Sequence, residues 1–162
     1  GDFVPKRTTY LMLGSFPTKP SHRYDWFYAN GRNQFWPIME EVYGLELRTK
    51  EEQRQLFSQL GMALADIILS CERKHNSNLD VNLFNHVYNI KGITAIITKN
   101  RLKQIFFTSR YVETLFRKHF KDILQLYPKI KLICLPSPSP RYAVLSKQEK
   151  VKSYKKLLPK LS

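Results

Sequence analysis

The sequence predicts an α/β fold, a three-layer α/β/α sandwich with a central four-stranded parallel sheet, and two observations indicate it. Short apolar runs alternate with longer amphipathic segments, which is the pattern of parallel strands joined by helical crossovers. Loops that contain Ser and Pro follow the first and last of these runs, as loops do at the carboxyl edge of such a sheet. With 162 residues and no linker-like segment, residues 1–162 are expected to form a single domain.

Four runs have the length and composition of buried strands. The first, residues 8–13, ends at Gly14, and the second, residues 65–70, reads Ala-Asp-Ile-Ile-Leu-Ser. The third and fourth cover residues 104–108 and 130–135. Parallel strands that are buried on both faces are near-continuously apolar in this way.

Helical periodicity fills the intervals between these strands. The pattern over residues 34–43 ends at Gly44 and the pattern over residues 50–60 ends at Gly61, because glycine commonly follows the last turn of a helix. Three further segments show the same periodicity: residues 110–120, residues 147–158 and, more weakly, residues 92–99.

Basic residues dominate the charge of the chain. Lys and Arg outnumber Asp and Glu by 27 to 13, which gives a formal net charge of +14. The excess is concentrated between Lys91 and Lys131, where only Glu113 and Asp122 oppose the basic residues. Two interpretations remain open, because such a surface either binds a polyanion such as nucleic acid or only confers solubility.

The cysteines and histidines exclude several kinds of site. Cys71 and Cys134 are the only cysteines, so a four-thiolate zinc or iron–sulfur site within the chain is excluded, and free thiols in a reducing compartment are expected. The four histidines lack metal-ligand spacing. No run resembles a signal peptide or a membrane span. We therefore expect no cofactor, no membrane partner and a location that is cytoplasmic in a bacterium or nuclear-type, not secreted.

Three segments carry the candidate site. Gly-Ser-Phe-Pro at residues 14–17 follows the first strand, an aromatic stretch leads from Tyr28 to Asn-Gln-Phe-Trp at residues 33–36, and Leu-Pro-Ser-Pro-Ser-Pro at residues 135–140 follows the last strand. Neither a P-loop, a dinucleotide fingerprint nor a nucleophile elbow is present. Because the carboxyl ends of parallel strands meet at one edge, these segments point to one pocket.

In this combination the chain resembles the uracil-DNA glycosylase superfamily, and most closely its hypoxanthine-DNA (deoxyinosine) glycosylase branch. That branch carries Gly-Ser-x-Pro after the first strand, an aromatic stretch that runs into Arg-Asn-x-Phe-Trp, and a late Leu-Pro-Ser-x-Ser-Pro loop. This chain supplies all three in that order, and residues 61–66, 70–73 and 106–110 also resemble the branch. The resemblance covers nearly the whole chain.

The resemblance implies the expected sandwich fold and a repair reaction, the hydrolysis of the N-glycosidic bond of a deaminated base in DNA. Hypoxanthine is the expected base, with uracil or xanthine as further candidates, and no cofactor is needed. The enzyme must flip the base out of the stack, because the bond is inaccessible in the duplex. It must then place a water at the sugar carbon and stabilise the departing base. The expected partner is DNA that contains such a base, bound by a monomer.

Two residues are catalytic candidates under this resemblance. Asn33 would position the water, since an amide both donates and accepts hydrogen bonds without titrating. Asn33 also stands where a helix N-cap would, and the two roles can coexist. Ser15 would present its hydroxyl or backbone N–H to the base or the water, and its alternative role is to end the strand with a side-chain turn bond.

Aromatic residues and one threonine are the base-binding candidates. Tyr28 would stack on the flipped base, because every base has a π-face. Phe16 and Phe27 compete for this role, and any of the three could instead belong to the core. Thr108 lies in the segment 106–110 that resembles the branch and is the remaining candidate.

The late loop supplies the DNA-binding candidates Ser137, Ser139, Arg141 and Tyr142. Its prolines stiffen the backbone and leave hydroxyls and amides for phosphates. In the superfamily this loop pinches the DNA backbone, and the residues after it fill the gap left by the flipped base, a role for Arg141 or Tyr142. The alternative is an ordinary Pro-rich turn.

Some positions depart from the superfamily pattern. Several branches have Asn, Asp or Gln in the first loop and His in the last, where this chain has Ser15 and Ser137. Relatives of the branch have His-Pro where this chain has Asn-Gly at residues 30–31. No general base and no cationic stabiliser of the leaving group is evident, so catalysis would depend on Asn33 and on backbone dipoles.

Asp66 falls at the start of the second predicted strand, where we expect a structural carboxylate that caps a backbone turn, with a catalytic role as the alternative. Two other functions stay open. The chain could be a superfamily member that has lost catalysis and only binds DNA or damaged nucleotides, or an unrelated α/β enzyme that acts on an anionic small molecule.

Overall fold

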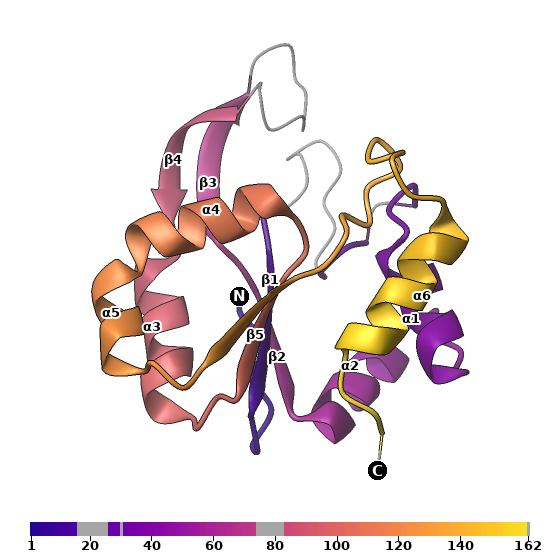
Figure 1. Cartoon of the computed structure of the whole chain (residues 1–162), viewed down its shortest axis with the longest axis horizontal. Helices are drawn as coiled ribbons and strands as arrows, with labels where there is room; N and C mark the ends of the chain where they lie inside the picture. The colour runs from indigo at the N-terminus through magenta and orange to yellow at the C-terminus, as the bar shows by residue number, and fades with distance from the viewer. Residues whose placement is uncertain (16–25, 30, 74–82, 162) are drawn as a thin grey trace.

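The computed structural model describes residues 1–15, 26–29, 31–73 and 83–161, with residues 70–73 and 83–86 described by their backbone only, and it has the expected α/β/α architecture (Figure 1). A four-stranded sheet with the order β2-β1-β5-β6 forms the middle layer. All three pairings in it are parallel, so its four carboxyl ends lie at one edge. The strands are β1 (Tyr10–Gly14), β2 (Met62–Asp66), β5 (Gln104–Phe107) and β6 (Lys131–Cys134).

Helices cover both faces of this sheet (Figure 1). One face carries α1 (Phe35–Tyr43), α2 (Lys50–Leu60) and α6 (Lys147–Leu157). The other carries α3 (Ile90–Lys99), α4 (Arg110–His119) and α5 (Lys121–Leu126). Five of these helices lie where the periodicity predicts them. The short α5 was not predicted, because six residues are too few to show a helical period.

The strands of the sheet supply two hydrophobic cores. Met12 and Phe106 point to the face with α1, α2 and α6, and Leu11, Leu13 and Phe107 point to the face with α3, α4 and α5. All five side chains are completely buried. Alternate residues of one strand therefore fill opposite cores, which explains why each strand is apolar at consecutive positions.

Local signals define several helix ends. The side chains of Thr49 and Ser146 form capping boxes at the N-termini of α2 and α6, each with a Glu three residues later. Gly44 and Gly61 end α1 and α2 with φ angles of 63° and 68°, as the sequence predicts. These left-handed conformations favour glycine, which has no Cβ to clash with the backbone.

The predicted position of the second strand was wrong. Strand β2 lies upstream of the run 65–70 and overlaps it only at its end. The second half of that run, residues 68–70, belongs to β3 (Ile68–Arg73), which pairs antiparallel with β4 (Leu83–Tyr88) in a separate two-stranded sheet that we did not predict. Ile67 alone separates β2 from β3, so no Gly or Pro marks the boundary. Asp66 consequently ends a strand of the main sheet instead of beginning one.

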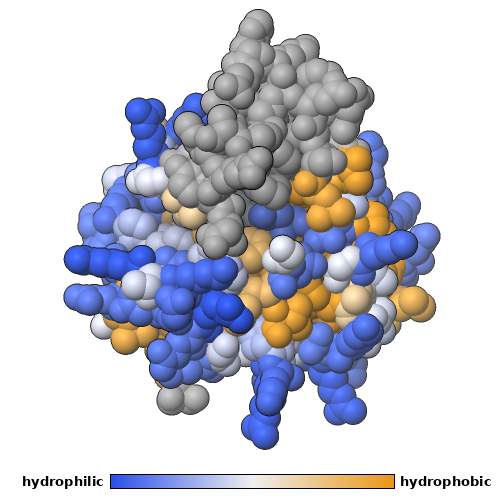
Figure 2. Space-filling model, turned by 180° about the vertical axis from the view of Figure 1, so that it is seen from behind, coloured by the Kyte–Doolittle hydropathy of each residue, from blue (hydrophilic) through white to orange (hydrophobic). Residues whose placement is uncertain are grey.

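The surface is mostly hydrophilic, with some apolar side chains among the charged ones. Figure 2, seen from behind, shows hydrophilic side chains over much of this face and an apolar region beside the grey atoms. Leu69 of β3 and Val87 of β4 are each more than half exposed. The two-stranded sheet therefore presents part of its apolar surface to solvent.

Candidate functional site

Four strand ends meet where the sequence predicts the site. Gly14 ends β1, Asp66 ends β2, Thr108 follows β5 and Leu135 follows β6. Thr108 is buried, and its hydroxyl and its backbone N–H both donate to the carbonyl of Leu13, at 3.2 and 3.1 Å. The first residue after β5 is thus joined directly to the carboxyl end of β1.

Two side-chain oxygens crowd against Gly14. A Cβ at this position would lie 2.6 Å from Oδ1 of Asp66 and 2.8 Å from the hydroxyl oxygen of Tyr28. Glycine therefore lets both side chains approach the end of β1. The Tyr28 hydroxyl is buried and makes no hydrogen bond of good geometry among the described residues, although the Thr108 side chain lies close enough to affect its pKa. A buried polar atom without a partner calls for an explanation, and at the carboxyl edge of an α/β sheet contact with a ligand is one.

The backbone of Tyr28 is strained. Its φ of 53° is the one positive value at a non-glycine among the described residues, and such a conformation costs on the order of 1–2 kcal/mol. Stacking helps to hold it, because the Tyr28 and Phe35 rings lie 3.9 Å apart between centroids at 21°. Phe35 therefore covers one face of the Tyr28 ring.

Of the two phenylalanines that compete with Tyr28, the structure describes Phe27. Phe27 is partly buried, its ring packs edge-on against Trp26 with 5.1 Å between centroids, and its carbonyl accepts a hydrogen bond from Nε1 of Trp36 at 2.8 Å. These contacts place Phe27 against the core. Phe16 lies outside the described residues.

Burial shifts the pKa values of the two groups beside Gly14. Desolvation, and after it the charge of Asp2, raises the pKa of Asp66 to about 7. Desolvation also raises the pKa of Tyr28 well above its usual value, the charge of Asp66 adds to this effect, and the Thr108 side chain opposes it. Tyr28 therefore stays protonated at neutral pH, while Asp66 changes its charge near pH 7.

The variant Asp66→Asn is expected to remove a pH dependence of stability. The folded state holds the Asp66 proton up to about pH 7, and the unfolded chain releases it near pH 4. The contribution of Asp66 to the free energy of unfolding therefore falls as the pH rises from about 4 to about 7. One pKa unit corresponds to about 1.4 kcal/mol. Between these limits, the free energy of unfolding of the variant should therefore rise by roughly 2–4 kcal/mol relative to that of wild type.

Urea unfolding of both proteins at pH 5 and pH 8 measures this difference. Asp122→Asn, which removes an exposed carboxylate, serves as the control and should follow wild type at both values. An Asp66→Asn protein whose stability relative to wild type is the same at pH 5 and pH 8 would contradict the raised pKa.

Asn33 is separated from α1 by Gln34 alone, and its side chain caps the start of the helix. Its Oδ1 accepts a hydrogen bond from the backbone N–H of Phe35 at 2.8 Å. This bond fixes the amide plane and leaves the NH₂ group and one lone pair of Oδ1 for other partners. The backbone N–H of Gln34 donates to the carbonyl of Pro138 at 2.8 Å, so the start of α1 is tied to the late loop.

Ser15 follows β1, and its backbone carbonyl accepts a hydrogen bond from Ile68 N–H at 2.9 Å. A neighbouring bond joins the Ile67 N–H to the carbonyl of Gly14, also at 2.9 Å. Ser15 is therefore held beside the turn that leads from β2 into β3, and its side chain is partly buried.

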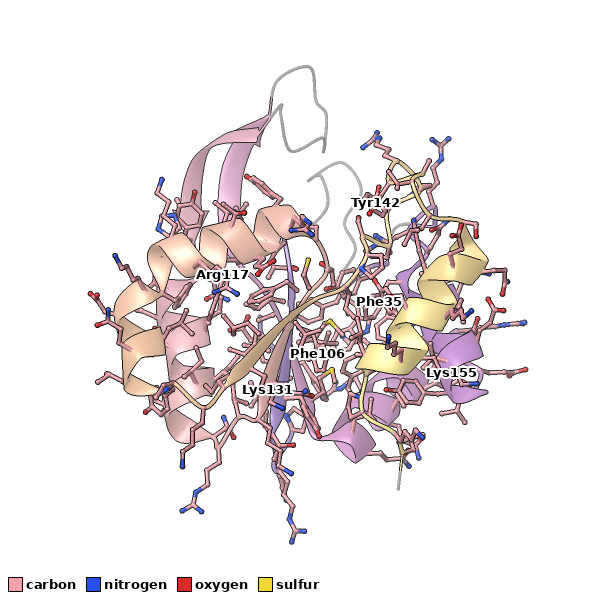
Figure 3. The ribbon with its side chains drawn as sticks, in the orientation of Figure 1. Phe35, Phe106, Arg117, Lys131, Tyr142 and Lys155 are labelled. Atoms are coloured by element: carbon pink, nitrogen blue, oxygen red, sulfur yellow. The ribbon has the colours of Figure 1, made fainter. Side chains whose placement is uncertain are left out.

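The hydroxyls of the late loop turn back onto the loop. Ser137 Oγ accepts a hydrogen bond from the N–H of Ser139 at 3.2 Å, and Ser139 Oγ accepts one from the N–H of Arg141 at 3.3 Å. These two amides are thus used within the loop, while the hydroxyl protons remain to be donated. Arg141 and Tyr142 are exposed (Figure 3 labels Tyr142). The loop therefore presents one cation and one aromatic ring to solvent.

Two residues of α6 hold this loop and were not singled out from the sequence. The Tyr154 hydroxyl donates to the carbonyl of Pro136 at 2.7 Å, and Lys150 Nζ donates to the carbonyl of Ser139 at 3.0 Å. Both side chains are buried. Sequence patterns gave no signal for Lys150, because lysine on a charged amphipathic helix is normally exposed.

Part of the basic surface lies away from this edge. A cavity of about 450 Å³ is lined by Lys103, Lys129 and Lys131 together with Tyr10 and neighbouring residues. These residues lie at or just before the amino ends of strands, so the cavity is at the opposite edge from Gly14 (Figure 3 labels Lys131). The basic residues between 91 and 131 therefore do not all face the predicted site.

Two further observations concern the part of the chain that the structure describes. No group of three or more His, Cys, Asp or Glu side chains there could hold a metal ion. No described helix combines the length and the apolarity that crossing a membrane requires.

Comparison with solved structures gives several matches. One of them is the solution NMR structure described as "a putative Uracil DNA glycosylase from Methanosarcina acetivorans", with a TM-score of 0.73 and 21% sequence identity over 97% of this chain and 92% of that chain. A scan of protein-family models gave no match, and a search of curated proteins gave none either. The chain therefore shares the α/β/α fold of a uracil-DNA glycosylase-like protein.

Proposed function

We propose that this protein is a monofunctional DNA repair glycosylase that removes a deaminated base from DNA, with hypoxanthine as the first candidate and uracil or xanthine as others. The base would be flipped from the duplex into the carboxyl edge of the sheet, and an abasic site would remain. No cofactor enters the reaction, and a monomer suits an enzyme that must surround a duplex.

The reaction needs one water and one departing base. The water oxygen bonds to the sugar carbon C1′, the N-glycosidic bond breaks with its electron pair going to the base, and the water proton ends on the base nitrogen. Asn33 would orient the water through its NH₂ group and the remaining lone pair of Oδ1, since the Phe35 N–H already fixes the amide. Thr108 and Ser15 are the candidates for contacts with the base or the water.

The observation that carries the proposal is the buried Tyr28 hydroxyl, which lies against Gly14 and makes no hydrogen bond of good geometry within the described part of the chain. It is held there by a strained backbone and by stacking on Phe35, and strain of this kind gathers at functional sites. A flipped base carries donors and acceptors on its edge, and one of them could pair with this hydroxyl. The likeness of the whole fold to a uracil-DNA glycosylase-like protein supports the same function.

One observation favours the alternative of a DNA-binding protein without catalysis. Oδ1 of Asn33 already accepts the Phe35 N–H, which is the bond that a purely structural cap needs. The positions where several branches have acidic or amide residues and His hold Ser15 and Ser137. A binding protein would use Arg141 of the late loop on DNA phosphates and release no base.

Base release from defined duplexes distinguishes the two functions. Labelled duplexes with a single deoxyinosine, deoxyuridine or deoxyxanthosine are incubated with the protein, treated with alkali to cut any abasic site, and separated by length. The glycosylase proposal expects cutting at one or more of these lesions and none in the undamaged duplex. Salt-sensitive binding of every duplex without any cutting would favour the binding protein.

A further inference from the structure

Lys150 is a buried lysine at the junction of the late loop and α1. Its side chain is only 1% exposed. Nζ donates to Oε1 of Gln34 at 2.8 Å and to the carbonyl of Ser139 at 3.0 Å, and it lies 5.5 Å from the centre of the Tyr142 ring. One ammonium group thus contacts both the segment that carries Asn33 and the loop predicted to bind DNA.

The charge of Lys150 is not balanced within the described part of the protein. Both of its hydrogen-bond acceptors are neutral, and no described carboxylate forms an ion pair with it. The neighbouring Glu149 caps the N-terminus of α6 through Ser146. Desolvation lowers the pKa of Lys150. A buried cation without a counter-charge destabilises a fold, and it is retained where function needs it.

The loop above this cation has its carbonyl groups engaged by the protein. The carbonyls of Pro136, Pro138 and Ser139 accept hydrogen bonds from Tyr154, Gln34 and Lys150, respectively. Carbonyl oxygens repel a phosphate, so directing three of them to protein donors favours an anion on the outer side of the loop. Arg141, exposed on the same loop, adds a second positive charge.

We propose that Lys150 supplies buried, uncompensated positive charge to a phosphate-binding site on the outer side of the Ser137–Tyr142 loop, and that a DNA backbone phosphate is its counter-charge. The inference rests on the proposed function, because it takes DNA as the ligand. It assigns Lys150 a positioning and electrostatic role in binding, not a role at the scissile bond.

Two lysines on one helix provide a matched test. Lys150→Met removes the buried charge, and Lys155→Met removes an exposed charge from the last turn of the same helix (Figure 3 labels Lys155). Binding of an undamaged duplex is measured at several salt concentrations, well below the melting temperature of each variant. Lys150→Met should raise the Kd about tenfold and reduce the salt slope by roughly one, whereas Lys155→Met should change the Kd less than about twofold.

A second variant keeps the contact and cancels the charge. Gln34→Glu retains an oxygen acceptor for Lys150 but makes it negative, and Gln55→Glu on the exposed side of α2 adds the same charge elsewhere. Gln34→Glu should also raise the Kd about tenfold, with Gln55→Glu close to wild type. This arm remains informative if Lys150→Met does not fold.

The outcomes separate this inference from the function on which it rests. If wild type binds duplex DNA but Gln34→Glu binds as tightly as Gln55→Glu, Lys150 is only a structural tie and the inference is overturned. Lys150→Met and Lys155→Met with equal Kd values and equal salt slopes overturn it as well. A wild-type protein that binds no duplex overturns the proposed function itself.

Discussion

Replacing Asn33 with alanine is expected to slow base release at least about 100-fold while the protein stays folded. Alanine has no group that can orient a water. Losing the hydrogen bond from the Phe35 N–H to the side chain of residue 33 should cost only about 1 kcal/mol of stability. Single-turnover cleavage of a deoxyinosine duplex, with protein in excess, measures the rate. Urea unfolding measures the stability of the same samples.

Asn33→Ser separates the two roles of this residue. Serine is a good N-cap and can accept the Phe35 N–H, but it has no amide group. The serine variant should therefore keep nearly wild-type stability and lose activity as severely as the alanine variant. If serine restored the rate along with the stability, Asn33 would act only as a helix cap and the mechanism would be wrong.

Gly14→Ala is expected to reduce both stability and activity. The new Cβ would lie 2.6 Å from Asp66 Oδ1 and 2.8 Å from the Tyr28 hydroxyl, too close for either atom to stay in place. Stacking on Phe35 keeps the Tyr28 ring from moving freely. Overpacking of this kind costs about 1–3 kcal/mol of stability, and displacement of Tyr28 from the site should lower kcat/KM at least tenfold.

Two further variants show whether steric clash of the new Cβ causes the losses expected for Gly14→Ala. Adding Tyr28→Phe to Gly14→Ala removes one of the two clashing oxygens and should recover part of the lost stability, as thermal unfolding would show. Gly31→Ala has open space around its Cβ and should stay within about 0.5 kcal/mol of wild type. A Gly14→Ala protein as stable and active as wild type would mean that Tyr28 and Asp66 do not depend on close approach to β1.

Much of the fold could be predicted from local sequence patterns. The strands at residues 104–108 and 130–135 were predictable because each holds a short apolar run, which is completely buried in β5 and partly buried in the edge strand β6. Gly44 and Gly61 mark helix ends because their positive φ angles favour glycine. The β2–β3 boundary was not predictable, since one sheet passes into another through Ile67 without a turn residue.

The candidate site was predictable in its parts but not in its contacts. Motif order indicated Asn33, Tyr28 and the late loop, and the structure ties the start of α1 to that loop. Asp66 was misplaced along with β2, so its approach to Tyr28 at Gly14 could not be foreseen. The burial of Lys150 could not be predicted from the sequence, because tertiary packing, not helical periodicity, decides whether a lysine is exposed.

The most direct test of glycosylase activity is to identify the products of one turnover. Protein in excess is mixed with a duplex that carries one deoxyinosine, the released base is quantified by chromatography, and the DNA strand is weighed by mass spectrometry without alkali. A glycosylase should give free hypoxanthine and an intact abasic strand in equal amounts. An unchanged strand for this lesion and for the uracil and xanthine duplexes, with the DNA still bound, would contradict catalysis at this site.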